Sequence, residues 1–590
     1  MKNFFKILLA SFVANFLLLV LFIVFVVVVM GSMLSKSEEP ISIDSGSILK
    51  LNLDKPIVDR ANENSLSKFN TGFLSFGMDE SLGLDKLLAY IDKAATDENI
   101  KGICIDVTSV NAGWATVDEI RNAIIKFRKS GKFVVSYSDI YDQKAYYLAS
   151  ASDKVMLSPQ GMLLLNGLES GRMFYKKALD KLGVEAVVIR HGKFKSYVEP
   201  YILDKMSDEN RLQTMTYLNS IWNHVLTGIA TERKLNADSL NRLVSALAIR
   251  NPETAIKYRL IDSLMYKDEI LNHLATLSGD KGGKPKFVSF ERYAQTALPR
   301  TSKGLAHNKI AVVYFTGEIV MGNGSDESIG SERFGKALRE ARADSSIKAV
   351  VIRINSGGGS ALASENIWRE VALTRKVKPV VASFGDVAAS GGYYIAAESD
   401  TILASPVTIT GSIGVFGLLV NTQKLMNDKL GINYDVAKTN PYADLGNPMR
   451  KMSDIEKAVL QQGVEDMYQT FVKRISDGRK LTKSYVDSIG QGRVWAGTNA
   501  LSLKLIDGYA GLDSAVRIAA HRAKITDYRT VALPKLKDPI EEISEKLSGV
   551  PSEKAMKAVM GEWYSTYKML QSASAKSGIY TRLPYEIEIH

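Results

Sequence analysis

Two hydrophobic patterns alternate along most of the chain. Short runs of β-branched residues, such as VVIRI at 350–354 and VVAS at 380–383, have the length and composition of buried strands. Between them, residues 363–374 place apolar side chains at the three- and four-residue spacing of an amphipathic helix. Strand, helix and strand in this order predict a mainly parallel sheet covered by helices, so we expect an α/β fold.

The same pattern occurs twice. The segments IKGICI at 100–105 and IKAVVI at 347–352 lie 247 positions apart, and so do the Ser-Asp pairs that end at Asp153 and Asp400. Constant spacing over this length predicts two homologous domains. Further matching segments are 132–135 with 378–381, 145–149 with 392–396, and 260–262 with 505–507.

The repeat and the composition around it suggest the domain boundaries. We expect residues 1–45 to form a cytoplasmic stub and a transmembrane anchor, 46–300 the first copy, and 301–538 the second copy. The proline and glycine within 295–308 mark the junction between the copies. Residues 539–590 form a C-terminal tail whose composition indicates no role.

The N-terminal part is strongly apolar. Residues 7–35 contain no charged side chain and are mostly Leu, Val, Phe and Ile, which is long enough for a helix to cross about 30 Å of hydrocarbon. A cleaved signal peptide has a shorter apolar region of about 7–15 residues, so we expect an uncleaved single-pass anchor. Lys2 and Lys6 precede it, and the positive-inside rule then predicts a cytoplasmic N-terminus and a periplasmic main part.

Charge and composition exclude several classes of function. The formal net charge is +11, but the Lys and Arg residues are spread along the chain without a basic arm. We therefore expect no nucleic-acid partner, and a weakly cationic surface beside anionic membrane lipid. Cys104, the single cysteine, lies in an apolar run typical of a buried strand rather than of a nucleophile. Cys104 and the six histidines show no metal-ligand spacing, so we expect no metal and no cofactor.

Two glycine-rich turns follow strands of the second copy. They read NSGGGS at 355–360 and DVAASGGYY at 386–394. Such turns expose backbone N–H groups that can bind a phosphate or the oxyanion of acyl transfer, although ordinary helix caps are the alternative. No Gly-Lys-Ser/Thr is present, which argues against a nucleotide loop. Ser390, between Ala389 and Gly391, is the candidate nucleophile, because substrate can reach a small hydroxyl at the start of a helix.

A serine nucleophile needs a base. The chain has no G-x-S-x-G elbow, and His307, the histidine nearest upstream of the second copy, lies in the expected linker. A lysine can replace the His–Asp pair of other serine hydrolases, which leaves a Ser/Lys pair as the remaining option. With a reference pKa of about 10.4, such a lysine must be buried in an apolar site to lose its proton near neutral pH.

The two turns and a third motif, TGSIGV at 410–415, strongly resemble the signal peptide peptidase A family in its long, duplicated bacterial form. The resemblance covers about 51–538 and implies two tandem domains of crotonase/Clp-protease-like fold. It also implies a membrane-anchored serine endopeptidase of the bacterial inner membrane. Such an enzyme degrades released signal peptides and other peptides at the periplasmic face, and assembles as a homotetramer. Gly357 stands where the family usually has proline, a change that reduces rigidity but removes no functional group.

The same resemblance implies the catalytic residues. FKSYVEP at 194–200 matches the motif that carries the general base in the long form, so Lys195 is the expected base. The other roles fall on the second copy: Ser390 as the nucleophile, Gly359 and Gly391 as the oxyanion donors, and Ser412 as the residue that orients the base.

The repeat supports a site divided between the two copies. Gln143 occupies the place of Ser390 at the offset of 247, and Ala443 occupies the place of Lys195 at the later offset of 248. Each copy thus lacks the group that the other supplies, so we expect the site between two domains of one chain. Two alternatives remain: a crotonase-type enzyme that acts on acyl-CoA thioesters, and an inactive scaffold of the same fold.

Overall fold

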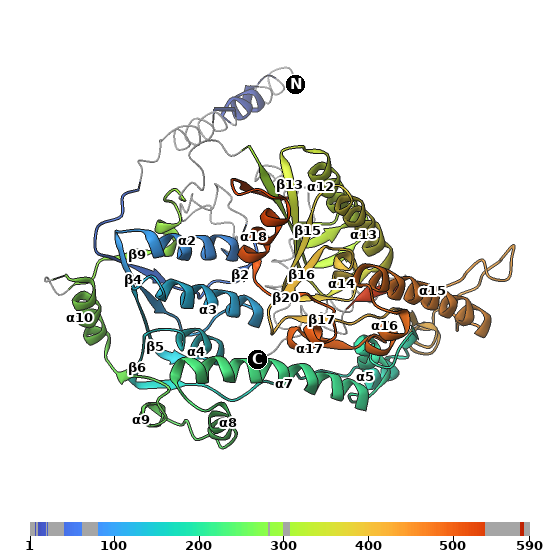
Figure 1. Ribbon diagram of the computed structural model, residues 1–590. Coiled ribbons are helices and arrows are strands. Elements are labelled where there is room, and N and C mark those ends of the chain that lie inside the picture. Colours follow the sequence, from blue (N-terminus) through green and yellow to red (C-terminus); the bar gives the residue numbers. More distant parts are fainter. Residues whose placement is uncertain are drawn as a thin grey trace.

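The computed structural model of the chain describes residues 6, 10–18, 20–21, 41–61, 81–280, 284–298, 307–536 and 579–582. Two α/β units lie side by side in its main body, coloured blue to green and yellow to red in Figure 1. Within these residues no helix is both long and apolar enough to cross a membrane. Most of the expected anchor at 7–35, and most of the expected tail at 539–590, lies outside the described residues.

The first copy is built on a six-stranded sheet in which every neighbouring pair of strands is parallel. In spatial order the strands are β8 (Ser263–Leu264), β6 (Lys154–Leu163), β5 (Phe133–Tyr141), β4 (Ile100–Asp106), β1 (Ser47–Leu51) and β9 (Phe287–Ser289). The short strands β2 (Ile57–Val58) and β3 (Leu82–Gly83) pair separately. Its helices are α2 (Leu84–Thr96), α3 (Trp114–Arg128), α4 (Gln143–Ala149), α5 (Lys176–Leu182), the 3-10 turn η2 (Ser196–Val198), α6 (Glu199–Ile202), α7 (Asp208–Arg233), α8 (Ala237–Ser245), α9 (Pro252–Lys257), α10 (Lys267–Ser278) and α11 (Phe290–Tyr293).

The second copy repeats this plan. In spatial order its main sheet contains β19 (Val494–Ala496), β17 (Ile409–Gly411), β15 (Val380–Ala389), β13 (Ile347–Ser356), β10 (Lys309–Thr316) and β21 (Arg529–Leu533), with β16 (Thr401–Ala404) and β20 (Gly508–Tyr509) beside β15. Only the β17–β19 pair of this sheet is antiparallel. Its helices are α12 (Ser331–Ala343), α13 (Ala361–Arg375), α14 (Gly391–Ala396), the π-helical turn η3 (Leu425–Lys429), α15 (Asp454–Arg479), α16 (Lys483–Ile489), α17 (Gly497–Ser502) and α18 (Leu512–Arg522).

The elements expected from the hydrophobic pattern are present. The runs at 350–354 and 380–383 lie in β13 and β15, which are adjacent and parallel, and 363–374 lies in α13. Most residues of β13 are buried, because helices cover both faces of the sheet, and this explains its continuous apolar sequence. The expectation of an α/β fold is confirmed.

Equivalent side chains of the two copies make equivalent hydrogen bonds. The Tyr146 hydroxyl donates to the carbonyl oxygen of Leu260 at 2.7 Å, and Tyr393, 247 positions later, donates to that of Leu505 at 2.7 Å. Both tyrosines are fully buried, so each needs a partner for its hydroxyl. The copies therefore share their internal packing as well as their strand order.

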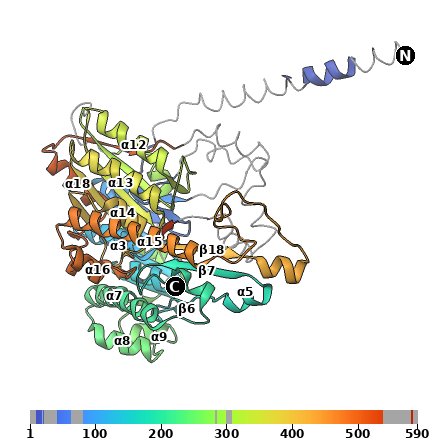
Figure 2. The same cartoon turned by 90° about the vertical axis from the view of Figure 1, so that its right-hand side faces the viewer.

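A segment of the first copy crosses onto the second. A further sheet has the order β12 (Ser328–Gly330), β11 (Glu318–Val320), β14 (Gly358–Ser360), β22 (Ile579–Arg582), β18 (Phe416–Asn421) and β7 (Glu185–Arg190). β7 comes from the first copy and pairs antiparallel with β18, as Figure 2 shows. This crossing carries the chain after Arg190 into the second copy.

Buried charges join the copies elsewhere. The guanidinium of Arg353 on β13 is fully buried, and its nitrogens lie 2.7 Å from a carboxylate oxygen of Asp59 and 2.7 Å from one of Glu119, both from the first copy. Glu119 also accepts the backbone N–H of Leu512 at 3.0 Å. Buried charges are tolerated only when they are paired in this way, so these contacts define how the copies fit together.

Candidate active site

The hydroxyl of Ser390 lies in the turn between β15 and α14, where the residue is fully buried rather than open to solvent as the sequence suggested. β15 ends at Ala389 and α14 begins at Gly391, so Ser390 is the residue between strand and helix. Its φ of 54° lies in the left-handed region, which costs about 1–3 kcal/mol for a residue other than glycine. The backbone N–H of Ser390 donates to the carbonyl oxygen of Gly411 at 2.8 Å, which helps to hold this conformation.

The side chain of Lys195 reaches this turn from the other copy. Its Nζ lies 2.9 Å from the Oγ of Ser390, 3.0 Å from the Oγ of Ser412 and 3.2 Å from the carbonyl oxygen of Ser412. A neutral amine can donate two hydrogen bonds and accept one. It can therefore donate to Ser412 and accept the O–H of Ser390, which is the contact a general base needs.

The surroundings of Lys195 favour this neutral form. The side chain is fully buried, and the loss of solvation lowers its pKa well below the usual value for lysine. The Nζ lies 5.9 Å from the centre of the Phe416 ring, and Phe416 packs with Val198 and Leu418 in one apolar cluster. Burial beside this cluster therefore favours the neutral amine, the form that can accept a proton.

Gly492 packs directly against the backbone of Lys195. Gly492 has a φ of +84°, and a Cβ added there would lie 2.6 Å from the Lys195 backbone nitrogen and 2.7 Å from its Cα. Real Cβ atoms do not approach backbone this closely, so a side chain at this position would displace Lys195. The sequence analysis missed Gly492, because a single glycine between polar residues carries no signal without its neighbours in space.

The glycines of the two turns lie close together beside Ser390. Gly391 is the first residue of α14, where the N–H has no acceptor within the helix. Gly358 has a φ of +97°, and a Cβ added there would lie 2.7 Å from the Gly391 nitrogen and 3.1 Å from the Ser390 Cβ. Gly359 follows in β14 and pairs with Ile319 of β11. This arrangement resembles an oxyanion hole, in which fixed N–H groups surround developing negative charge.

The chain's own C-terminal strand lies across these glycines. β22 runs antiparallel to β14 with Gly359 opposite Thr581, and the Thr581 hydroxyl donates to the Gly359 carbonyl oxygen at 3.3 Å. The Thr581 carbonyl oxygen is the atom nearest to the position that a Cβ on Gly358 would take. The sequence analysis assigned the tail no role, because pairing between residues more than 200 positions apart leaves no local pattern.

The positions that match Ser390 and Lys195 in the opposite copies hold no such pair. Gln143 begins α4, and its carboxamide bonds both backbone groups of Gly167, at 2.8 and 2.9 Å. Ala443 lies exposed in the loop between β18 and α15. Of the two pairs of equivalent positions, only Lys195 and Ser390 form a Ser/Lys contact in the described residues, and it lies at the boundary between the copies.

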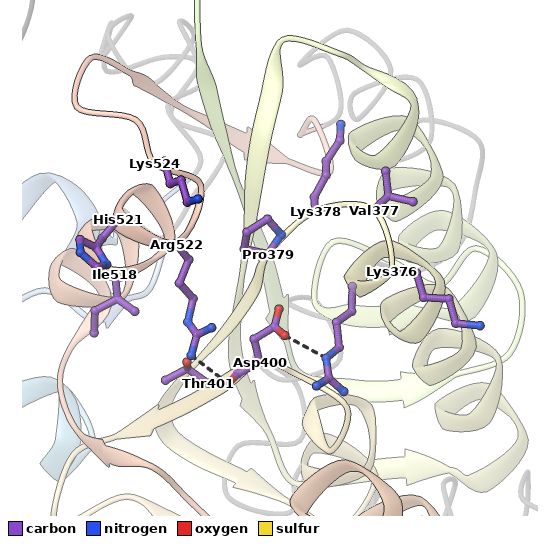
Figure 3. Close-up of a pocket in the computed structure, with 11 residues that line it drawn as sticks. Lys376, Val377, Lys378, Pro379, Asp400, Thr401, Ile518, His521, Arg522 and Lys524 are labelled. Atoms are coloured by element: carbon purple, nitrogen blue, oxygen red, sulfur yellow. Dashed lines mark hydrogen bonds and ion pairs between the residues drawn. The ribbon is translucent and has the colours of Figure 1, made fainter.

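A hollow of about 790 Å³ lies at the other end of the second sheet (Figure 3). Pro379 and Asp400, which line it, precede β15 and β16, so nearly the whole length of β15 separates it from Ser390. Its basic residues gather where α13 and α18 end, an arrangement that the helix dipole favours. The lining residues are Arg375, Lys376, Val377, Lys378, Pro379, Asp400, Thr401, Ile518, His521, Arg522 and Lys524.

Cys104 and the acidic residues offer no second centre in the described part of the chain. Cys104 is buried in β4, and desolvation raises the pKa of its thiol to about 12, which makes it a poor nucleophile. No three His, Cys, Asp or Glu side chains among the described residues come together as a metal ion would require.

Replacing Lys195 with Met tests whether the folded protein holds a neutral amine. Because burial lowers the folded pKa of Lys195, there is a pH range below the usual lysine pKa in which the unfolded chain binds a proton on Lys195 and the folded chain does not. This proton difference destabilises the wild type, and the effect shrinks as pH rises toward the usual lysine pKa of about 10.4. We expect Lys195→Met to unfold at a higher temperature than the wild type at pH 7, with the difference decreasing toward pH 10.

Calorimetry over a pH series measures this difference. The exposed Lys193, two residues earlier, provides the matched control for replacing a lysine with methionine. A difference for Lys195→Met that stays constant or grows with pH would mean that Lys195 is charged in the folded protein.

Comparisons with known proteins find relatives for both copies of the chain. The family model "Peptidase family S49" matches residues 126–281 and 372–526, one segment in each copy and together more than half of the chain. "Protease 4" of Haemophilus influenzae is 32% identical over 532 residues, which cover 86% of this chain and 84% of that protein. A protein of Enterococcus faecium described as a putative signal peptide peptidase is 33% identical over 204 residues, or 34% of this chain and 59% of that protein.

Among solved structures, a ClpP1 variant of Listeria monocytogenes has a TM-score of 0.24 and 13% identity, and the match covers 35% of this chain and 94% of that one. The expected relation to the Clp protease fold stays a prediction at this level of similarity. The match of both copies to one family model, together with the identity to Protease 4 over most of both chains, establishes that this chain belongs to peptidase family S49 and is a serine protease.

Proposed function

We propose that this protease cleaves peptide bonds with Ser390 as nucleophile and Lys195 as general base. The observation that carries the proposal is the distance of 2.9 Å between the Lys195 Nζ and the Ser390 Oγ, in a place where the amine is fully buried. A serine becomes nucleophilic when a neighbouring base takes its proton, and a lysine can do so once desolvation has lowered its pKa.

The geometry supports a two-step acyl transfer. As the Ser390 Oγ attacks the carbonyl carbon of the substrate, its proton moves to the Lys195 Nζ, and the negative oxygen of the tetrahedral intermediate lies beside the N–H groups of Gly391 and Gly359. The Lys195 ammonium then protonates the leaving amine as the C–N bond breaks. A water molecule then attacks the acyl-enzyme while its proton passes to Lys195. The ester bond to the Ser390 Oγ breaks, Lys195 gives that proton to the Oγ, and the acyl part of the substrate leaves as a carboxylic acid. Ser412, 3.0 Å from the Nζ, orients the amine throughout.

An extended peptide is the substrate that best fits the site. β22 lies antiparallel to β14 beside Ser390, so the edge of β14 can bind extended main chain. Peptides often bind to proteins by adding a strand to an exposed sheet edge in this way. We infer that a substrate peptide takes the place that β22 occupies. The alternative of an acyl-CoA enzyme offers no reason for a strand at this position.

We further propose that the chain is anchored in the bacterial inner membrane and degrades released signal peptides at its periplasmic face. The uncharged run at 7–35 supports the anchor, and Lys2 and Lys6 before it support a cytoplasmic N-terminus. The name of the Enterococcus faecium relative supports signal peptides as substrates.

The internal repeat supports another molecule of the same chain as a partner. In the first copy, the segment after Gly183 forms β7 and docks on β18 of the second copy. The matching segment of the second copy is 431–453, which we call the second-copy arm; it extends away from the body of the chain (Figure 1). The first-copy residues that match β18, 169–174, form no strand, and Met173 is 66% exposed.

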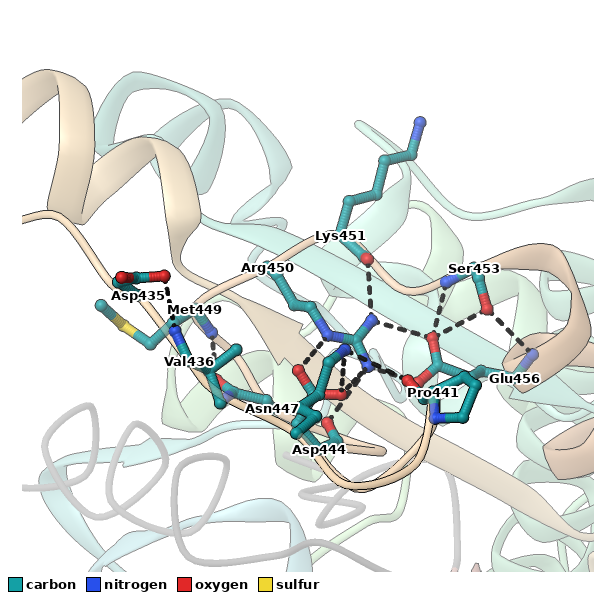
Figure 4. A network of polar contacts seen from close by, with 11 residues as sticks. Asp435, Val436, Pro441, Asp444, Asn447, Met449, Arg450, Lys451, Ser453 and Glu456 are labelled. Atoms are coloured by element: carbon teal, nitrogen blue, oxygen red, sulfur yellow. Dashed lines mark hydrogen bonds and ion pairs between the residues drawn. The ribbon is translucent and has the colours of Figure 1, made fainter.

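The second-copy arm is held in shape although it contacts little of the body. Arg450 lies 2.7 Å from a carboxylate oxygen of Asp444 and 2.9 Å from one of Glu456, and Lys438 lies 3.0 Å from Asp444 (Figure 4). The arm and the residue before it nevertheless expose large apolar side chains, namely Leu430, Ile432, Tyr434, Val436, Tyr442 and Leu445. We infer that the arm docks on the first copy of a neighbouring chain, head to tail, in a ring that the family resemblance puts at four subunits.

Replacing Ser390 with Ala tests the nucleophile, and replacing Lys195 with Arg tests the base. Each change should reduce kcat for a peptide substrate at least about 10³-fold, because alanine has no hydroxyl and arginine keeps its proton at any usable pH. Peptide cleavage is followed by mass spectrometry. Ser488→Ala, at an exposed serine on α16, is the matched control and should keep full activity. Substantial turnover by either site variant would contradict the assignment.

Deleting residues 579–590 tests whether β22 marks the substrate-binding edge. Without the strand that pairs with β14, a peptide substrate has no internal competitor, so KM should fall several-fold while kcat changes little. A variant that lacks only 585–590 keeps β22 and serves as the control. An unchanged KM, or a loss of activity, would show that peptides do not bind in place of β22.

Replacing Ile432 with Asp tests the docking of the second-copy arm. A charge on this exposed apolar side chain should weaken a contact that buries it, and so reduce the mass measured by analytical ultracentrifugation. Val377→Asp, at an exposed valine outside the arm, should leave the mass unchanged. A wild-type protein that is monomeric throughout, or an Ile432→Asp variant of unchanged mass, would be evidence against the proposed interface.

A further inference from the structure

Gln213 on α7 forms hydrogen bonds with the residues on both sides of Lys195. Its side chain is completely buried, and its Nε2 donates to the carbonyl oxygen of Phe194 at 3.0 Å and to the Oγ of Ser196 at 2.9 Å. Phe194 and Ser196 are the two chain neighbours of Lys195. The amide therefore holds the backbone before Lys195 and the side chain of the residue after it.

The other end of the same amide reaches the second copy. The Oε1 of Gln213 accepts the backbone N–H of Val494, the first residue of β19, at 3.0 Å. The residue before it, Arg493, accepts the backbone N–H of Ser412 through its carbonyl oxygen at 2.7 Å. Gln213 thus connects the backbone that carries Lys195 to the segment that holds Ser412.

We infer that Gln213 is a positioning residue for Lys195, which sets the Lys195 Nζ between Ser390 and Ser412. The inference rests on the Ser/Lys pair proposed above. Gln213 touches none of the reacting atoms and acts through the backbone of residues 194–196 and 491–494. A displacement of about 1 Å at a reacting group can reduce a rate about 10²-fold, so restraint of this kind has a measurable effect.

The repeat provides an internal comparison. α7 and α15 both begin after a serine cap, Ser207 and Ser453, and this match aligns Gln213 with Val459. Val459 is 58% exposed, in the copy that supplies no lysine. A buried amide is unfavourable unless its N–H groups and its oxygen all find partners, whereas an apolar residue would pack in the same space without that requirement. The buried amide thus occurs in the first copy, which supplies the lysine, and an apolar residue takes its place in the second copy, which does not.

The groups around Lys195 allow its titration to report on its position. Its lowered pKa is caused by desolvation, so a lysine that moves toward water should regain protons at higher pH. The titratable and charged groups on the surrounding elements include Arg493, which lies over the rings of Phe194 and Trp495. They also include Glu199, which accepts hydrogen bonds from Ser207 and Asn210, and His191, whose Nδ1 lies 2.6 Å from a carboxylate oxygen of Glu465.

Gln213→Met provides the test, because methionine has a similar length and makes none of these hydrogen bonds. We expect kcat for a peptide substrate to fall about 10²-fold with KM within about twofold, since the hydrogen bonds of Gln213 go to Phe194, Ser196 and Val494 and not to β14 or β22. We also expect the limb of the pH–rate profile on which activity rises with pH to move to higher pH, so that alkaline buffer restores part of the loss. A role in folding alone would move the thermal midpoint but not this limb.

Gln213→Glu supplies a second variant of the same size if the methionine variant unfolds. Glutamate still accepts the Val494 N–H but cannot donate to Phe194, and its negative charge favours the protonated lysine, so its limb should lie at higher pH than that of Gln213→Met. Gln462→Met, at an exposed glutamine on α15, is the matched control and should equal the wild type in kcat and pH profile.

The outcomes separate this inference from the proposed function. Activity in Lys195→Arg, or failure of a fluorophosphonate probe to label wild-type Ser390, would refute the Ser/Lys pair itself. If both of those tests support the pair, a folded Gln213→Met variant with kcat within about threefold of wild type, or with an unmoved pH limb, overturns the positioning role alone.

Discussion

An amine can act as a base near neutral pH only if folding removes water from it, and the site described here depends on this constraint. The side chain of Lys195 is fully buried, and its Nζ lies near the Phe416 ring and the hydroxyl groups of Ser390 and Ser412. Burial of a charge in such a place is so unfavourable that the group loses its proton instead. The same burial that destabilises the charged lysine therefore supplies the proposed base, and water at this position would remove both effects.

Exclusion of water from Lys195 requires the two copies to fit closely, because neither encloses the amine alone. Matched polar contacts provide this fit: Arg353 pairs with Asp59 and Glu119, and Asp386 of the second copy accepts the N–H and hydroxyl of Thr116 at 2.9 and 2.6 Å. Each contact spans the boundary, so a shift of one copy would leave several buried groups unpaired. The pairing of β7 with β18 then delivers the lysine segment at a fixed register.

Much of the plan of the molecule could be predicted from local pattern. The strands at 350–354 and 380–383, the helix between them and the duplication all follow from the spacing of apolar residues, since burial on a sheet or helix face imposes a short period on the sequence. The turn at Ser390 was also recognisable, because glycines between a strand and a helix are contiguous in sequence. The anchor at 7–35 rests on the same kind of local signal and stays a prediction.

The sequence by itself therefore determined the α/β class, the two copies and a short set of candidate residues that included Ser390, Lys195 and Ser412. Only the tertiary structure decided how these meet, because a contact between residues 195 positions apart depends on how the copies pack and leaves no period along the chain. The residues that hold Lys195 in place could not be predicted for the same reason. Gly492 and Gln213 resemble any other glycine or glutamine until the packing brings them against the lysine backbone. Local periodicity records which face of an element is buried, whereas the groups that meet across a buried boundary are fixed by packing in three dimensions.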